Sequence, residues 1–221
     1  MIQEFKKDLQ SLASPEKAVI LQRFFKTGKG QYGEGDIFLG IVVPEQRILA
    51  KKYYQELDLD DVQVLLNSKT HEERLIALLI LVLKYQKGDE LLKEKVVKFY
   101  LKNTKNINNW DLVDLSAEKI VGAFLLNKTD KDKQIIYKLA KSDNLWERRI
   151  AMLTTFHFIK NKEFDDALQI AEILLHDKHD LIQKAVGWML REIGKRDLVV
   201  EEEFLQKHYK SMPRTMLRYA I

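Results

Sequence analysis

Cysteine is absent from this sequence of 221 residues, and proline and glycine are scarce. The lack of cysteine excludes disulfide bonds, thiolate nucleophiles and cysteine-based zinc sites. Only three prolines and nine glycines are present, and four of these glycines lie within residues 28–35, so most of the chain contains few helix breakers. We therefore expect an all-helical protein without a sheet.

Long apolar runs are missing as well. The longest, Leu75–Leu83, is about half as long as a segment that crosses a bilayer. The first ten residues, MIQEFKKDLQ, lack the apolar core of a signal peptide. We therefore expect a cytoplasmic protein that does not associate with membranes.

Charge of both signs is abundant, but the excess of positive charge is small. The 37 basic and 33 acidic residues give a net charge of +4, which supports nucleic-acid binding only weakly. Their distribution says more, because residues 205–221 contain four basic residues and no acid. With 46% hydrophobic and 32% charged residues, the chain has the composition of a globular protein with its own core.

Apolar residues recur at the i, i+3, i+4 and i+7 spacing of helices along nearly the whole chain. Ser14 followed by Pro15 marks one helix start, and Thr70 with Glu73 has the spacing of a capping box at another. The expected helices are 15–26, one from 44, 58–67, one from 70, 88–101, 108–126, 130–140, 144–159, 163–175, 179–194, 197–209 and 213–221.

Three helical segments resemble one another and indicate an internal repeat. HEERLIALLI, LWERRIAMLT and IQKAVGWMLR can be placed so that Ala77, Ala151 and Gly187 align, at spacings of 74 and 36 residues. The same register aligns two further sets, Glu73, Glu147 and Gln183, and Arg74, Arg148 and Lys184. The implied period of about 37 residues is close to that of HEAT repeats. Adding 37 to 77 gives Asp114, so a carboxylate is predicted where the other repeats place a small packing residue.

Stacked helix pairs of this kind form a solenoid whose second helices line a concave face. We therefore predict a single domain, residues 1–221, with the fold of an α-solenoid of HEAT-like antiparallel helix pairs. Its concave face would be basic and would suit a long, regular ligand such as a DNA duplex.

The tryptophans supply the first candidates for a functional site. Trp110 and Asp114 are four residues apart and project from one face of the expected helix. Trp146 and Trp188 also have charged residues on their helix faces. Taken alone, each tryptophan is better explained by core packing, and Asp114 by solvent exposure or by an ion pair with Lys119 or an arginine.

Four separated motifs resemble those of the HEAT-like alkylpurine DNA glycosylases, the AlkD type. IFLGIVVPEQR (Ile37–Arg47) is similar to the FLG-x-x-x-PE-x-R element of that family, and NNWDLVD (Asn108–Asp114) to its tryptophan-aspartate motif. SDNLWERR (Ser142–Arg149) and IQKAVGWMLRE (Ile182–Glu192) resemble the two later motifs. Their order and spacing also agree, which makes the resemblance more specific than any single motif.

The resemblance implies a role for each matched residue. Asp114 would be the catalytic carboxylate, Trp110 and Trp188 would flank the lesion nucleotide, and Arg149 would support the site. Some members of the family have two tryptophans where this chain has Asn109 and Trp110, so a contribution from the first ring is lacking here. The resemblance implies double-stranded DNA with alkylated bases as the partner, and we expect a monomer.

The chemistry of such a reaction explains why one carboxylate is enough. Most glycosidases need a second carboxyl group to protonate the leaving group. A purine alkylated on a ring nitrogen is already cationic and leaves as a neutral base, so a single carboxylate can stabilise the oxocarbenium charge and position water. Nothing marks a lysine as a Schiff-base nucleophile. We therefore expect a monofunctional hydrolase that needs no metal and no organic cofactor.

A set of mostly basic residues is predicted to contact DNA: Tyr32, Arg47, Arg148, Lys184, Arg191 and Lys195. The glycine-rich segment 27–36 would clasp the DNA backbone or form a surface loop, and it lacks the spacing of a phosphate-binding P-loop. The segment His176–Asp180 resembles a metal site, but capping of the helix that follows is the simpler interpretation. The alternative function is a non-catalytic HEAT-like scaffold that binds DNA or protein, since solenoids mostly serve as binding surfaces.

Overall fold

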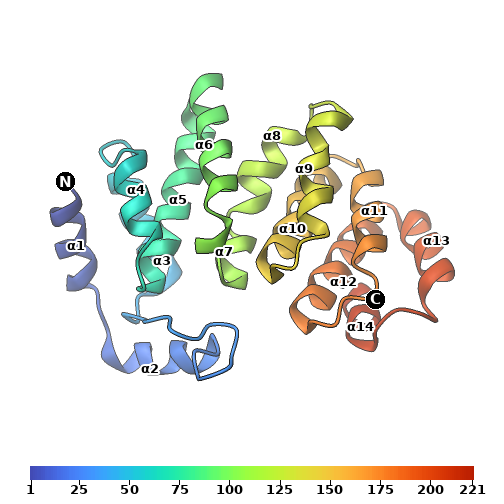
Figure 1. The fold of residues 1–221 in the computed structure, drawn as a ribbon, viewed down its shortest axis with the longest axis horizontal. Helices are drawn as coiled ribbons and strands as arrows, with labels where there is room; N and C mark the ends of the chain where they lie inside the picture. The colour runs from blue at the N-terminus through green and yellow to red at the C-terminus, as the bar shows by residue number, and fades with distance from the viewer. The chain divides into compact units, whose positions relative to one another are not determined.

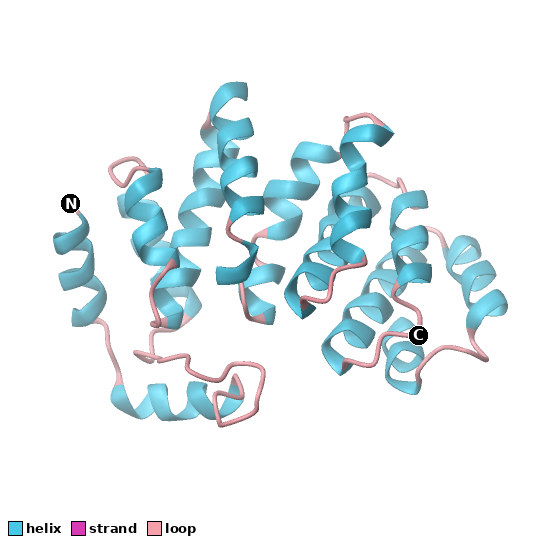
Figure 2. Ribbon diagram, in the orientation of Figure 1, coloured by secondary structure: helices cyan, strands magenta, loops and turns pink.

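The computed structural model describes all 221 residues, and they form an all-α protein (Figure 2). The single element of extended pairing is an isolated parallel bridge between Ile37 and Thr70. The predicted fold class, all-α, is confirmed. No helix is both long and apolar enough to span a membrane.

The chain divides into two compact units, Met1–Ser116 and Ala117–Ile221. The helices of the first unit (Figure 1) are α1 (Ile2–Ser11), α2 (Pro15–Phe24), α3 (Val43–Tyr53), α4 (Leu59–Leu66), α5 (His71–Lys87), α6 (Glu90–Lys102), the 3-10 helix η1 (Thr104–Asn106) and α7 (Trp110–Asp114). Those of the second are the π-helix η2 (Glu118–Gly122), α8 (Ala123–Leu125), α9 (Asp130–Ala140), α10 (Leu145–Lys160), α11 (Asp165–Ile173), α12 (Asp180–Gly194), α13 (Leu198–His208) and α14 (Arg214–Ala220).

Two parts of the helix prediction were wrong. The helix α1 was not predicted, although Phe5 and Leu9 bury its apolar face. The expected helix 108–126 is interrupted, because α7 ends at Asp114 and a π-helix begins only at Glu118. Most other helices lie within a few residues of their predicted bounds.

The first unit is built around α5, which packs against α3, α4, α6 and α7. Its residues Leu75–Val82 are all buried, which explains the apolar run in the sequence. The carboxylate of Glu72, fully buried at the start of α5, accepts hydrogen bonds from the backbone N–H groups of Leu39, Gly40 and Ile41 at 2.9–3.2 Å. The FLG element is therefore held by a buried acid in α5.

Four helices begin after an N-cap residue with extended backbone, and three of these turns share the same hydrogen bonds. The N-cap residues are Thr70 for α5, Asn109 for α7, Asn144 for α10 and His179 for α12. In three of these turns, the side chain two residues earlier accepts a hydrogen bond from the N-cap backbone N–H: Ser68, Ser142 and Asp177. Thr70 itself makes no side-chain capping bond, so the predicted capping box with Glu73 was wrong.

A second side chain closes each of these three turns. It lies four residues after the N-cap and donates a hydrogen bond of 2.8–2.9 Å to the carbonyl two residues before the N-cap. The donors are Arg74 in α5, Arg148 in α10 and Gln183 in α12. The alignment of Lys184 with Arg74 and Arg148 was therefore wrong by one residue, because the N-caps of α10 and α12 are 35 rather than 36 residues apart (179 − 144).

The same register corrects the expectation for Asp114. The N-cap of α7 follows that of α5 by 39 residues (109 − 70), two more than the period of 37. The counterpart of Ala77 is therefore Ser116, which is fully buried. Asp114 lies five residues after its N-cap, the position of Arg149 in α10 and Lys184 in α12. This position carries charged side chains in these three helices, and the residue two places later is fully buried in each: Ser116, Ala151 and Val186.

The second unit is organised by α10 and α12, which pack against each other and against their neighbours. Two glycines permit close approach of backbones. A Cβ on Gly122 would lie 2.5 Å from the carbonyl oxygen of Thr154, and one on Gly187 would lie 2.3 Å from that of Met216. The absence of a side chain at Gly187 therefore allows α14 to lie directly on α12. The single repeat domain and its concave basic face stay predictions.

Candidate functional site

The helix α7 carries Trp110 at its first residue and Asp114 at its last. Five residues are too few for a helix that is stable by itself, so its position depends on contacts with the rest of the unit. The backbone N–H of Trp110 donates to the Oδ1 atom of the fully buried Asn109 at 2.8 Å, and Leu112 and Val113 are also fully buried. These contacts leave both ends of α7 partly exposed at Trp110 and Asp114.

The ring of Trp110 lies at the end of a column of aromatic side chains. It stacks on Phe25 at a centroid distance of 5.0 Å and an interplanar angle of 13°, and the edge of Phe24 meets it at 5.9 Å. Phe25 stacks in turn on Phe38 at 5.0 Å, and Phe38 on the imidazole of His71 at 4.4 Å. The plane of the tryptophan is therefore set by rings from three other segments of the first unit.

The carboxylate of Asp114 is half-buried and makes interactions within the protein. Its charge influences Tyr100, which is fully buried on α6. Burial and the negative charge of Asp114 raise the pKa of Tyr100 above its ordinary value, and a hydrogen bond with Ser116 opposes them. The hydroxyl group of Ser116 donates to the carbonyl of Leu112, and its Oγ atom lies 3.0 Å from the hydroxyl oxygen of Tyr100. The C-terminal end of α7 is thus fixed to α6 by a buried hydroxyl pair.

Four buried ionisable groups form a cluster that includes Asp111 of α7. The two imidazole nitrogens of His71 face carboxylates on opposite sides, Asp111 at 2.8 Å from Nε2 and Asp36 at 3.2 Å from Nδ1. Asp36 also forms an ion pair of 2.6 Å with Arg74. Burial opposes ionisation of Asp36, but the hydrogen bond from His71 and the charge of Arg74 lower its pKa below the usual range.

In the second unit, Trp188 lies on α12 and is partly exposed. It meets Phe156 of α10 at a centroid distance of 5.6 Å in a tilted arrangement. The ammonium group of Lys160 lies 4.2 Å from the Phe156 ring centroid. Glu192, one turn after Trp188, has its pKa lowered: its burial is outweighed by hydrogen bonds from Lys195, Arg196 and Trp188. This aromatic pair is therefore bordered by charges of both signs.

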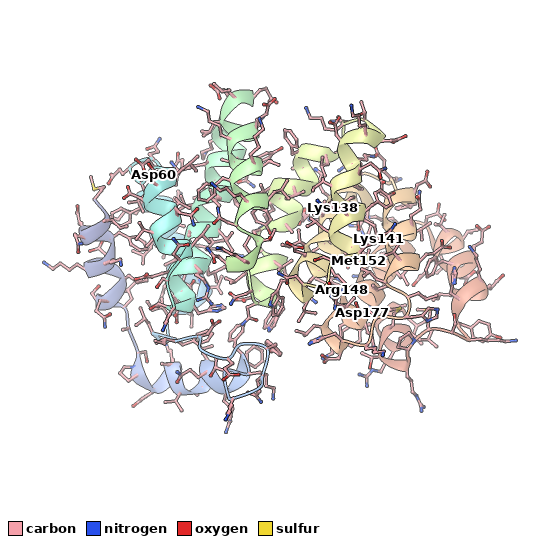
Figure 3. All side chains as sticks on the ribbon, viewed as in Figure 1. Asp60, Lys138, Lys141, Arg148, Met152 and Asp177 are labelled. Carbon is pink, nitrogen blue, oxygen red and sulfur yellow. The ribbon has the colours of Figure 1, made fainter.

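The two arginines at the start of α10 join helices of the second unit. Arg149 is buried and its Nη1 atom donates to the carbonyl of Leu181 in α12. Arg148 donates from Nε to Asp177 at 2.7 Å and from Nη1 to the carbonyls of Ser142 and Asp143 at 2.9 Å. Figure 3 shows Arg148 and Asp177 side by side, from α10 and from the turn before α12. Both arginines therefore have structural partners, and their roles at DNA stay predictions.

The other predicted DNA contacts differ in how they are held. Arg47 on α3 and Arg191 on α12 are exposed, and Tyr32 is half-buried. Lys184 and Lys195 form ion pairs with acids of their own segment, at 2.8 Å with Asp180 and at 2.5 Å with Glu192. Asp180 is exposed, so its pair with Lys184 stabilises the fold little, whereas Glu192 is buried.

Two segments with ambiguous sequences have a clear local role. The glycine-rich segment 27–36 folds back on itself, with backbone N–H groups of Gly30 and Gly33 donating to Glu34 and to the carbonyl of Lys26. The segment His176–Asp180 forms the capping turn of α12, in which Nδ1 of His179 accepts from the backbone N–H of Leu181 at 3.2 Å. The capping interpretation of this segment is confirmed.

The sequence reasoning missed the residues that support α7, namely Phe25, Phe38, Asp36, His71 and Asp111. Two of them could have been found. His71 lies one residue after the N-cap Thr70, and Asp111 lies two residues after the N-cap Asn109. Each precedes an apolar run, so its side chain is buried if the first turn of its helix packs against the protein. The other three come from irregular segments, for which periodicity has no information.

Comparison with known proteins places the chain in a family. The sequence model of the DNA alkylation repair enzymes matches residues 5–221. A predicted DNA alkylation repair enzyme from Enterococcus faecalis has a similar fold, with a TM-score of 0.74, 19% identity and 94% of each chain covered. The crystal structure of AlkD2 from Streptococcus mutans is also similar, with a TM-score of 0.58, 18% identity, and 92% of this chain and 94% of that chain covered. A search of curated proteins gave no match.

Proposed function

Because the chain belongs to the family of DNA alkylation repair enzymes, we propose that it is a monofunctional DNA glycosylase acting in base excision repair. Its substrate would be duplex DNA with cationic purines alkylated at N3 or N7, and it would hydrolyse their N-glycosidic bond. One observation carries the proposal: α7 holds a partly exposed carboxylate, Asp114, one helical turn from the partly exposed ring of Trp110.

Each group has a role in the proposed reaction. The bond between the sugar and the alkylated base breaks with its electron pair moving to the base, which leaves neutral because it was cationic. The deoxyribose then carries oxocarbenium charge, which the negative charge of Asp114 stabilises. Water adds to the sugar carbon and loses a proton to Asp114 or to solvent, which leaves an abasic site.

Each tryptophan would offer an aromatic face to a cationic nucleotide. The face of an aromatic ring attracts a cation by about 0.5–2 kcal/mol, most strongly for tryptophan. Trp110 offers one such face and Trp188 another, and each ring contacts a phenylalanine ring. Arg149 would act through the placement of α12, since it binds the carbonyl of Leu181. The exposed bases Arg47 and Arg191, with Lys184 and Lys195, would bind phosphates.

The test is release of free base. The protein is incubated with a duplex containing one 7-methylguanine, and the free base is measured by mass spectrometry in single-turnover conditions. We expect release by the wild-type protein and a rate about a hundred- to a thousandfold lower for Asp114→Asn, because one well-placed electrostatic group contributes about 2.7–4 kcal/mol to the transition state. Affinity for the duplex should be retained, because the substitution removes a negative charge.

The matched control is Asp60→Asn, which removes an exposed carboxylate from the first turn of α4. It should release base at the wild-type rate. Equal rates for the wild type and Asp114→Asn would contradict the catalytic role. A wild-type protein that binds the duplex and releases no base would instead support the scaffold function.

A further inference from the structure

The placement of α7 depends on buried charges rather than on the helix itself. Within its five residues, Asp111 is the buried acid. Its Oδ2 atom is 2.8 Å from Nε2 of His71, and its Oδ1 atom is buried without a hydrogen-bond partner. His71 is therefore the one hydrogen-bonding partner of this carboxylate, and it connects the first turn of α7 to α5.

The charges around His71 balance only when its imidazole is protonated. Asp111 from α7 and Asp36 from the segment before α3 contact it, and Arg74 from α5, which pairs with Asp36, acts on it by charge. All four side chains are buried, with relative exposures of 1% for His71, 4% for Arg74, 6% for Asp111 and 7% for Asp36. Two carboxylates and one guanidinium leave one negative charge, which an imidazolium cancels. Without that proton, a buried carboxylate on α7 would lack a counter-ion, which is costly.

A second set of contacts connects His71 with Trp110, the first residue of α7. The imidazole stacks on Phe38 at 4.4 Å and lies 5.0 Å from the centroid of Phe25, whose ring is stacked against Trp110. A cationic imidazole is attracted to these aromatic faces. His71 therefore reaches both the backbone of α7, through Asp111, and the ring at its first residue.

We propose that His71 is a positioning residue of the candidate site. Its buried imidazolium, held between Asp36 and Asp111, fixes α7 and thereby the geometry of Trp110 and Asp114. It touches neither the sugar nor the base. The inference rests on the proposed function, and it adds that base release requires a protonated histidine beneath the site.

The direction of the pH dependence follows from the surroundings of His71. Burial lowers its pKa, but the charge of Asp111 and the hydrogen bonds with Asp111 and Asp36 outweigh it, so the pKa lies above its ordinary value. A raised pKa means that the imidazolium and its contribution are fully present below the ordinary pKa of histidine and are lost as the pH rises through the raised pKa. Base release should therefore fall on the alkaline side of that pKa.

The experiment measures single-turnover release of 7-methylguanine against pH for the wild type, His71→Gln and Asp111→Asn. We expect the wild-type rate to fall at alkaline pH. His71→Gln should be slower at neutral pH by up to about a hundredfold, because a displacement of about 1 Å in catalytic geometry costs that much. It should also lack the alkaline fall and retain duplex affinity.

Asp111→Asn keeps the shape of the side chain and removes one of the charges that hold the proton on His71. The alkaline fall should move to lower pH in this variant. The double variant His71→Gln, Asp111→Asn removes the uncompensated carboxylate and should recover part of the rate lost in His71→Gln. If His71→Gln fails to fold, Asp111→Asn and the double variant still test whether a protonated His71 positions α7. Identical pH profiles in the wild type and Asp111→Asn would overturn the proposal.

A measurement without substrate separates this inference from the proposed function. In the background Trp146→Phe, Trp188→Phe, fluorescence reports Trp110 alone, since the chain has three tryptophans. Its emission should change with pH around one pKa, and adding His71→Gln should abolish that step. If this step is present and the wild type releases no base, the proposed function fails and the coupling stands. If base is released and the emission does not respond to His71, the positioning role is wrong and the function stands.

Discussion

The two helices that carry the candidate stacking residues, α7 and α12, are held in opposite ways. The helix α12 has fifteen residues, and its apolar side chains at helical spacing, such as Ile182 and Met189, are fully buried. The helix α7 has five residues and is fixed by the amide of Asn109, the buried acid Asp111 and a column of aromatic rings. One position results from a continuous apolar face, the other from a few polar and aromatic contacts.

The difference has consequences for tolerance to substitution. An apolar face distributes its stabilisation over many side chains, so no single one decides where the helix lies. A short helix held by a buried charge pair depends on each partner, because removal of one leaves the other without compensation. We therefore expect the surroundings of Trp110 to be more sensitive than those of Trp188.

The largest contrast should come from the acids in the first turns of the two helices. Asp111→Ala should lower the free energy of unfolding by about 3–5 kcal/mol, because it leaves the buried cations His71 and Arg74 with Asp36 as their one remaining carboxylate. Asp180→Ala on α12 should lower it by less than about 1 kcal/mol, because this carboxylate is 58% exposed and its partner is Lys184. Urea denaturation measures both. Equal losses would mean that the buried cluster does not stabilise α7.

Alanine substitutions of two glycines should differ less in the free energy of unfolding that they cost. Gly187→Ala should cost about 1–3 kcal/mol, because the new Cβ would lie 2.3 Å from the carbonyl oxygen of Met216, and α14 is fixed by the buried Met216 and Ala220. Gly40→Ala should cost about 1–2 kcal/mol, mainly because its φ of +85° disfavours a side chain. The new Cβ would also lie 2.1 Å from the carbonyl oxygen of Ser14, and relief of this contact requires a shift of α2, a helix without a buried side chain.

Thermal unfolding of both glycine variants provides the measurement. The order of the two losses is the informative outcome. A larger loss for Gly40→Ala than for Gly187→Ala would show that α2 is more firmly held than its exposed side chains indicate.

The two aromatic pairs, Phe25 with Trp110 and Phe156 with Trp188, should differ by a smaller amount in their coupling energies. A double-mutant cycle on Phe25 and Trp110, with leucine replacements, should give a coupling energy of about 0.5–1.5 kcal/mol, as expected for well-stacked aromatic rings. The tilted pair Phe156 and Trp188 should couple more weakly, because its ring planes lie 56° apart against 13° in the first pair. Coupling in both pairs is measured from denaturation curves. A stronger coupling in the second pair would reverse the comparison.

The smallest effects are expected for single exposed bases on α12. If Arg191 or Lys184 binds a phosphate, charge reversal should weaken binding to damaged and undamaged duplexes alike. It should also reduce the dependence of log Kd on log salt concentration by about 0.9 for each phosphate that is no longer bound. Fluorescence anisotropy at several salt concentrations measures this slope. An unchanged slope in both variants would exclude these side chains as phosphate ligands.

The sequence predicted the long helices well and the site in part. The helices α10 and α12 begin within one residue of their predicted starts at 144 and 179, because capping and helical periodicity are local properties. The pairing of Trp110 with Asp114 on one short helix was also predicted, since it depends only on a spacing of four. The predicted repeat register was wrong by one residue in α12 and by two in α7, because a change of one or two residues in a turn moves every later position.

By itself, the sequence determined that this protein is all-α, because it lacks helix breakers and repeats its apolar residues at helical spacing. It also determined family membership, through motifs that are contiguous in the chain. Only the tertiary structure decided which residues support the site. Asp36, His71 and Asp111 are far apart in sequence, and their protonation and orientation depend on burial together, which no local pattern contains. A helix of five residues has no stability of its own, so its place is decided by the side chains that surround it.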